Sequence, residues 1–228
     1  MRHIQWMPIV LLLASDPRSN IRLNPIHSSM SAKSLTNRAR ARALKIQQSL
    51  NSPYDEILPY MYIGSDPSRL ANLDTDLDTY LTAQKFTHRI DCTAHPTKET
   101  ALPTFFITVT DDDKSTASLF QQLEQACDFI DAGKQQTDFK ILIHCVAGVS
   151  RSATVILYYL LTRRNQELSL AQLLQYMREK RPIVSPNPSF MRALCCVETK
   201  MGKPLSIDPD AYAVHRHGRA KNYIVFKI

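Results

Sequence analysis

One unbroken apolar run constrains the fold of this chain more than any other stretch. In "FKILIHC", residues 139–145, Ile141, Leu142 and Ile143 follow one another without a polar residue between them. A strand that is covered on one face alternates apolar and polar side chains, whereas a strand that is buried on both faces does not. The run therefore predicts a central strand with protein packed on both sides of it.

From residue 54 onward, short apolar runs alternate with longer helical patterns. Further strands are expected in "EILPYMYIG" (56–64), "THRIDCT" (87–93) and "TFFITVT" (104–110). Helices are expected at 77–86, 116–135, 152–164, 169–181 and 187–202. This alternation is typical of the α/β class, so we predict a single domain with a central, mostly parallel sheet flanked by helices.

The net charge of +7 is concentrated at the N-terminus. Residues 1–54 carry eight Lys and Arg against the single acid Asp16, and the remainder of the chain is balanced. We therefore expect a basic, disordered leader at 1–53, a folded domain at 54–202 and a C-terminal extension at 203–228. The extension lacks helical periodicity, and its end, "NYIVFKI", is compatible with an edge strand or a packed peptide.

The leader is compatible with several cellular locations. It begins with "MRHIQWMPIVLLLA", whose apolar part is too short for a stable membrane span, which takes roughly 20 residues. Its Arg- and Ser-rich continuation resembles a mitochondrial transit peptide, so mitochondrial or membrane association through residues 1–54 stays an alternative. The five cysteines are odd in number and have no metal-binding spacing, which favours a reducing compartment. We expect a cytoplasmic protein, with a nuclear location as a further alternative.

The stretch "HCVAGVSRS", residues 144–152, joins the central strand to a helix. In open α/β sheets, ligands bind at the carboxyl ends of the strands. A loop that enters a helix N-terminus directs backbone N–H groups to one place and adds the positive end of the helix dipole, which suits a phosphate. Gly148 permits the tight turn, and Arg151 offers donors that match phosphate oxygens.

The same surroundings would keep Cys145 as a reactive thiolate, because helix N-termini and nearby cations lower thiol pKa values. Alone, a cysteine at a strand end is more typical of a packed core residue. The six fixed positions of His-Cys-x-x-Gly-x-Ser-Arg-Ser favour catalysis. Ser152 can donate to the thiolate, and His144 can order the loop. We expect catalytic roles for Cys145, Arg151 and Ser152, and substrate binding by Val146, Ala147, Gly148, Val149, Ser150 and Arg151.

With these residues, "IHCVAGVSRSATVILYYLL" resembles the active-site strand, phosphate loop and following helix of the dual-specificity protein phosphatases, in the Cys-x5-Arg class. "ILPYMYIGS" and "REKRPIVSPNPSFMRAL" are similar to flanking segments of that family, and small atypical members are the most similar. The resemblance runs from about Tyr54 to Gly202. It implies a cysteine-phosphatase fold and hydrolysis of phosphotyrosine and phosphoserine/threonine through a phosphocysteine intermediate, without a metal or other cofactor.

The implied mechanism also needs an acid for the leaving oxygen. In the family this is an aspartate on a loop that precedes the cysteine, and here "TVTDDDKST" offers three. Alignment from the following helix places the match on Asp113, whereas strand alternation places it on Asp111. We expect Asp113 to be the acid and keep Asp111 as the alternative.

Two other functions remain as alternatives. A phosphoinositide or RNA 5′-phosphatase of the same class would ask for more cations than the uncharged interior 146–150 provides. A non-catalytic scaffold would be expected to lack Cys145 or Arg151. The expected partners are therefore phosphoproteins, with kinases left open, and not nucleic acid; the oligomeric state is not predicted.

Cys92 is either a packed core residue or a resolving cysteine for oxidised Cys145.

Overall fold

The computed structural model describes residues 41, 44, 47 and 48 and the ranges 52–67, 77–93, 101–108 and 116–217. Most of the expected leader, the aspartates at 111–113 and the stretch "NYIVFKI" lie outside the described residues.

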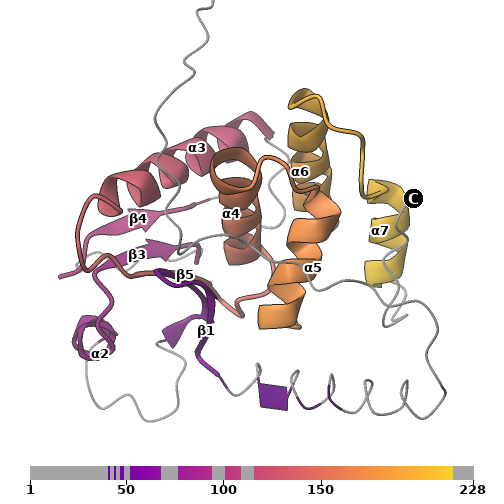
Figure 1. The fold of residues 1–228 in the computed structure, drawn as a ribbon. Coiled ribbons are helices and arrows are strands. Elements are labelled where there is room, and N and C mark those ends of the chain that lie inside the picture. The colour runs from indigo at the N-terminus through magenta and orange to yellow at the C-terminus, as the bar shows by residue number, and fades with distance from the viewer. Residues whose placement is uncertain are drawn as a thin grey trace, which may run out of the picture.

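The described chain is built on a five-stranded mixed sheet (Figure 1). The strands are β1 (Tyr54–Leu58), β2 (Met61–Ser65), β3 (His88–Asp91), β4 (Thr104–Phe106) and β5 (Ile141–Cys145), in the spatial order β1-β2-β5-β3-β4. Only the β1–β2 pair is antiparallel, and β2, β5, β3 and β4 run parallel to one another. The predicted α/β class with a mostly parallel central sheet is confirmed.

The single strand expected at 56–64 is wrong, because this stretch contributes to a hairpin of β1 and β2. The chain turns at Pro59 and Tyr60 between Leu58 and Met61. Proline fixes its backbone φ angle and lacks an N–H for the ladder, so it interrupts a strand. The apolar residues on either side of Pro59 made two strands look like one. Similarly, β4 ends at Phe106, earlier than the expected end at 110.

The helices match the expected positions closely, with one addition at the C-terminus. They are α2 (Leu77–Ala83), α3 (Thr116–Gly133), α4 (Arg151–Tyr159), the π-helical turn η2 (Leu160–Arg164), α5 (Leu170–Lys180), α6 (Pro188–Lys200) and α7 (Pro209–His217). The helix predicted at 152–164 is thus α4 continued by η2. Ser169 caps α5 in a capping box with Gln172, which explains the sharp start of that helix.

The central strand is buried on both faces, as its apolar run predicted. Ile141, Ile143 and Cys145 belong to the large core that α3, α4, α5 and α6 form on one face of the sheet. Leu142 points to the other face, where it packs in a smaller cluster with Leu81 of α2. Figure 1 shows α2 on its own side of the sheet, away from the other helices.

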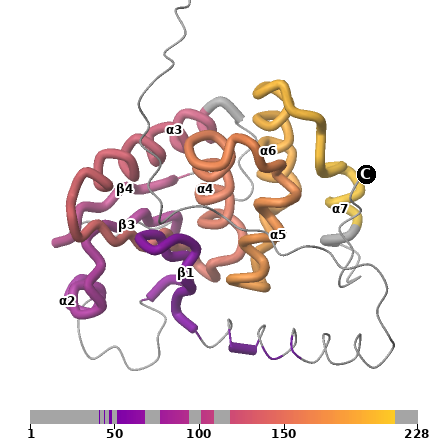
Figure 2. Tube along the Cα trace, in the orientation of Figure 1, coloured from indigo at the N-terminus to yellow at the C-terminus, as the bar shows by residue number. Residues whose placement is uncertain are grey.

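The prediction that residues 203–228 lack helical structure is wrong for the described part, because α7 forms there and packs against α6 (Figure 2). Ile207 and Tyr212 are buried, at 2% and 8% exposure. Glu198 of α6 is also buried and accepts hydrogen bonds from the N–H and hydroxyl of Ser206. Buried contacts therefore join the C-terminal segment to the body of the domain. Across the described parts of the chain, no helix is long and apolar enough to cross a membrane.

Candidate active site

Cys145 is the last residue of β5 and lies at the carboxyl end of three neighbouring parallel strands. In the strand register it is level with Ser65 of β2, and the preceding residue, His144, is level with Asp91 of β3. The Cys145 side chain is 3% exposed. The loop 146–150 then leads directly into α4, whose first residue is Arg151. The expected strand, loop and helix N-terminus are all present at this edge of the sheet.

The carbonyl groups of residues 146–150 all accept hydrogen bonds from outside the loop. In order along the loop, the donors are the N–H of Asp66 (3.4 Å), Nη2 and Nε of Arg181 (3.3 and 3.0 Å), the N–H of Ser185 (2.9 Å) and the N–H of Thr154 (2.9 Å). Because a peptide's N–H and C=O point in opposite directions, carbonyls that are bonded outward leave the neighbouring N–H groups facing inward. The loop is therefore a preformed ring of donors.

The Cys145 thiol lies against this ring. Burial alone raises its pKa, because the charged form loses water. The Ser152 hydroxyl donates to the sulfur over 3.3 Å, and the backbone N–H groups of Ser152, Ala147 and Val149 donate as well. These hydrogen bonds outweigh burial, so the pKa of Cys145 is lowered. Such a site can hold a thiolate, and it can offer the same donors to an anion placed above the sulfur.

Gly148 is required by the shape of the loop. Its φ is +65°, and a Cβ there would lie 2.5 Å from the carbonyl oxygen of Gly64 and 2.8 Å from Nη2 of Arg181. Neither the left-handed backbone nor the space admits a side chain. Gly148 thus allows the loop to press against β2 and against Arg181.

Arg181 and Asp55 support the loop from behind, and no sequence pattern singled them out. Arg181 is 1% exposed, and its guanidinium holds two loop carbonyls while Nη1 lies 2.6 Å from Oδ2 of Asp55 in β1. A buried guanidinium needs such partners, since an unpaired buried charge is costly. Arg181 directly follows α5 and precedes Pro182. Basic residues are common at the C-terminal ends of helices, so the sequence alone gave no reason to single this one out.

The segment 184–187 forms the outer wall of the loop. The N–H of Ser185 donates to the Val149 carbonyl over 2.9 Å, and the N–H of Asn187 donates to the Ser150 hydroxyl over 2.9 Å. The Asn187 side chain also caps α6 by accepting from the N–H of Phe190 over 2.7 Å. Asn187 therefore braces the loop and caps a helix at once.

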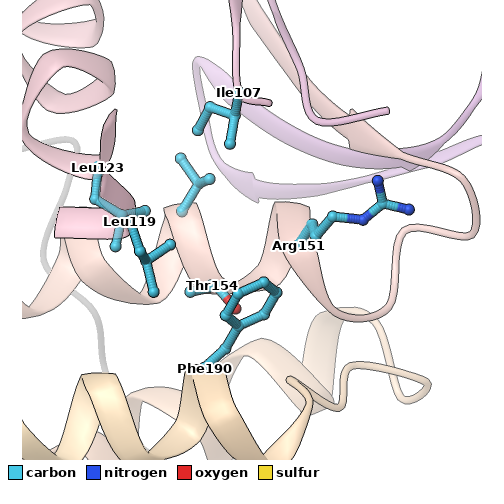
Figure 3. Close-up of a pocket in the computed structure, with 7 residues that line it drawn as sticks. Ile107, Leu119, Leu123, Arg151, Thr154 and Phe190 are labelled. Carbon is cyan, nitrogen blue, oxygen red and sulfur yellow. The ribbon is translucent and has the colours of Figure 1, made fainter. Parts of the chain in front are cut away.

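Arg151 lies on the first turn of α4 and is half-buried. Figure 3 shows its guanidinium directed away from a neighbouring apolar hollow. That hollow is lined by Ile107, Leu119, Leu123, Arg151, Thr154, Val155 and Phe190. The aliphatic part of Arg151 thus borders apolar packing, while its charged end points elsewhere.

Two further side chains lie close to Cys145. Cys92 is fully buried and its N–H donates to the His144 carbonyl over 2.8 Å. Burial and the nearby Cys145 raise the pKa of Cys92 well above its ordinary value, which fits a packed thiol. His144 is 1% exposed, and its Nε2 lies 3.9 Å from Oδ2 of Asp91. Burial lowers the pKa of His144, although Asp91 opposes this.

Asp111 and Asp113 fall outside the described residues, but the chain on either side of them is placed. Ile107, just after β4, donates its N–H to the Asp91 carbonyl over 2.8 Å. The N–H of Thr108 donates to Oε1 of Gln122 in α3 over 2.8 Å. Ile107 and Thr108 therefore lie near the carboxyl edge of the sheet, where Cys145 lies. Among the described residues, no group of three or more His, Cys, Asp or Glu is placed to hold a metal ion.

Comparison with known proteins agrees with this geometry. A family model described as "Dual specificity phosphatase, catalytic domain" matches residues 70–200. Dual specificity protein phosphatase 5 of Rattus norvegicus is 34% identical over 151 residues, or 64% of this chain; the match spans only 36% of that relative's length.

Solved structures agree as well. The crystal structure of human DUSP28 has a TM-score of 0.53 at 27% identity, with 66% of this chain and 96% of that chain covered. A mouse putative dual specificity phosphatase complexed with zinc tungstate has a TM-score of 0.53 at 26% identity, with 65% and 88% covered. The chain belongs to the family of dual specificity phosphatase catalytic domains.

Proposed function

We propose that this protein is a protein phosphatase that hydrolyses phosphotyrosine and phosphoserine/threonine through a phosphocysteine intermediate. One observation carries the proposal: the Cys145 thiol, whose pKa is lowered, lies against a loop whose carbonyls are all bonded outward. A nucleophile and a set of hydrogen-bond donors suited to an anion thus lie at the same place. Family membership supports the same reaction.

In the first step, the Cys145 thiolate attacks phosphorus and the bond to the substrate oxygen breaks. The inward N–H groups of residues 147–151 and the Arg151 guanidinium bind the non-bridging oxygens, where negative charge is redistributed. Asp113 donates its proton to the leaving oxygen, so that a neutral alcohol or phenol departs. Asp111 is the alternative donor.

In the second step, a water molecule attacks the phosphocysteine. The carboxylate left by the first step takes the water's proton, the S–P bond breaks, and inorganic phosphate and the Cys145 thiolate are released. Ser152 supports this departure, because its hydroxyl donates to the sulfur and stabilises the returning negative charge. The reaction as proposed consumes one water per phosphate and needs no redox partner.

The substrate class follows from the loop interior. Residues 146–150 carry no charged side chain, whereas a polyanionic lipid headgroup or RNA end favours several cations. We therefore propose phosphoproteins as substrates, with kinases among the candidates, in a reducing compartment such as the cytoplasm. The five cysteines, all free, are compatible with that compartment.

Substitution of the nucleophile tests the proposal. Cys145→Ser is expected to abolish phosphate release from p-nitrophenyl phosphate and to keep tungstate binding, measured by calorimetry, because the N–H ring remains. Asp113→Ala is expected to slow turnover most for alkyl phosphates, whose leaving group needs the proton. Unchanged turnover by Cys145→Ser would refute the mechanism, and a larger defect in Asp111→Ala would move the acid to Asp111.

A further inference from the structure

The helix α7 carries a buried tyrosine that faces the active-site wall. This helix lies outside residues 70–200, the part of the chain that the family model matches. Tyr212 is 8% exposed, and its hydroxyl donates to the Pro186 carbonyl over 2.7 Å and lies 3.3 Å from the Ser185 hydroxyl. Figure 1 shows α7 on the far side of α6 from the sheet, so the contact reaches back toward the site from the periphery.

The segment that Tyr212 holds is the one that holds the loop. Ser185 donates its N–H to the Val149 carbonyl, as described above. Val149 in turn directs its own N–H to the Cys145 sulfur, where it helps to lower the pKa of the thiol. Tyr212 is thus connected to the nucleophile through Ser185 and Val149.

The other contacts of this segment do not replace the tyrosine. Arg178 donates from Nε to the Val184 carbonyl over 2.9 Å, which fixes the start of the segment. Asn187 is fixed at its end as the cap of α6. Between them, Pro186 has no N–H, so its carbonyl is the one backbone group that can accept or donate a hydrogen bond. The Tyr212 hydroxyl donates a hydrogen bond to that carbonyl.

We propose that Tyr212 is a positioning residue for the phosphate loop, so that α7 is part of the working catalytic unit. The proposal rests on the proposed function for its kinetic consequence. Loss of the hydroxyl would free Pro186 and let Ser185 move away from Val149. The Val149 N–H would then be less well aimed at the thiolate and at the transferred phosphoryl group.

Tyr212→Phe tests this, because it removes the hydroxyl and keeps the ring in its buried place. The loss of one net hydrogen bond in positioning is expected to lower kcat for p-nitrophenyl phosphate about 3-fold to 10-fold, with a smaller change in KM. The pH midpoint of Cys145 alkylation by iodoacetate is expected to rise, in a Cys196→Ser background that removes the exposed competing thiol. The alkylation assay does not depend on turnover, so it tests Tyr212 even if the proposed phosphatase activity fails.

Asp210→Asn is the matched control on the same helix. The exposed Asp210 side chain is paired with Arg192 of α6 rather than with the segment 184–187, so its loss is expected to leave kcat and the alkylation midpoint unchanged. If Tyr212→Phe lowers the thermal unfolding midpoint alone and leaves kcat and the alkylation midpoint at wild-type values, Tyr212 is merely structural and the proposal is overturned. Equal kinetic defects in both variants would overturn it as well.

Discussion

The Cys145 thiol experiences two opposing influences on its pKa. Burial favours the neutral thiol, while the hydroxyl and N–H donors around it favour the thiolate and prevail. Because the folded-state pKa is lowered, ionisation of this group stabilises the fold at pH values above the unfolded pKa of about 8.5, and that contribution is lost as the pH falls through the folded value. The donors that prepare the nucleophile therefore also stabilise the folded chain at alkaline pH.

Ser152→Ala should raise the pKa of Cys145. A hydrogen bond to a charged group contributes about 1.5–3 kcal/mol, which corresponds to roughly one to two pKa units. The measurement is the pH dependence of Cys145 alkylation by iodoacetate in the Cys196→Ser background. If the alkylation midpoint equals that of the protein with Ser152 intact, the backbone N–H groups alone stabilise the thiolate.

Gly148→Ala should damage the site far more than Gly202→Ala, although both glycines have a positive φ. Each substitution carries backbone strain of about 1–3 kcal/mol. At Gly202 nothing lies within 4 Å of the new Cβ, whereas at Gly148 it would meet the Gly64 carbonyl and Arg181. We expect both variants to unfold at lower temperature and only Gly148→Ala to lose phosphatase activity, by more than about 100-fold if the loop is displaced. Equal activities would contradict the assigned role of Gly148.

At the scale of elements, the loop at residues 146–150 is held in place by the first strand, β1, and by the residue that follows helix α5. Arg181, directly after α5, joins the loop to Asp55 in β1. Arg181 therefore fixes the position of the loop relative to both elements. The guanidinium also places positive charge against the carbonyl groups of Ala147 and Gly148.

Arg181→Lys should release the loop while keeping the charge. The ammonium group cannot reproduce the fork that reaches both carbonyls and Asp55, so we expect a loss of about 2–4 kcal/mol in the free energy of unfolding and a lower kcat. Urea denaturation and turnover of an aryl phosphate measure the two effects. Lys180→Met, an exposed change one residue earlier, is the control and should leave both near the wild-type values.

The sequence predicted most elements but few of the contacts between them. Periodicity and turn residues located the central strand and the helix starts, because those depend on local pattern and on caps such as Ser169. The β1–β2 hairpin and α7 were missed, since the first is broken at Pro59 without a glycine signal and the second has little apolar periodicity. Arg181 was missed for another reason: its partners lie far away in the sequence, and no local pattern reports on them.

At the scale of the whole molecule, the sheet buries two histidines, one next to Cys145 in β5 and one at the opposite end of the neighbouring strand β3. His144 is 1% exposed and His88 5% exposed, and burial lowers the pKa of both. His144 is near Asp91, which raises its pKa, and near Arg89, which lowers it. The unfolded chain binds a proton at each histidine near pH 6.5, whereas the folded chain does so at lower pH. Stability is therefore lost progressively as the pH falls below about 6.5.

His144→Asn should weaken this acid sensitivity. A histidine that stays neutral in the folded state contributes up to about 1.4 kcal/mol of destabilisation at pH 5.5 relative to neutral pH. Urea denaturation at pH 7.5 and 5.5 measures the difference for the wild type and the variant. The same loss of unfolding free energy in both proteins would show that other groups account for the acid sensitivity.

The outward bonding of the loop carbonyls has a consequence for the end of each catalytic cycle. In the proposed reaction, a ring of donors that is already in place before substrate arrives has nothing to rearrange when the ester is cleaved, so it would bind the liberated inorganic phosphate much as it binds the phosphoryl group. Product would then compete with substrate for the same donors. Turnover by this protein would slow as phosphate accumulates, and the phosphate level of its surroundings would act as a brake on dephosphorylation.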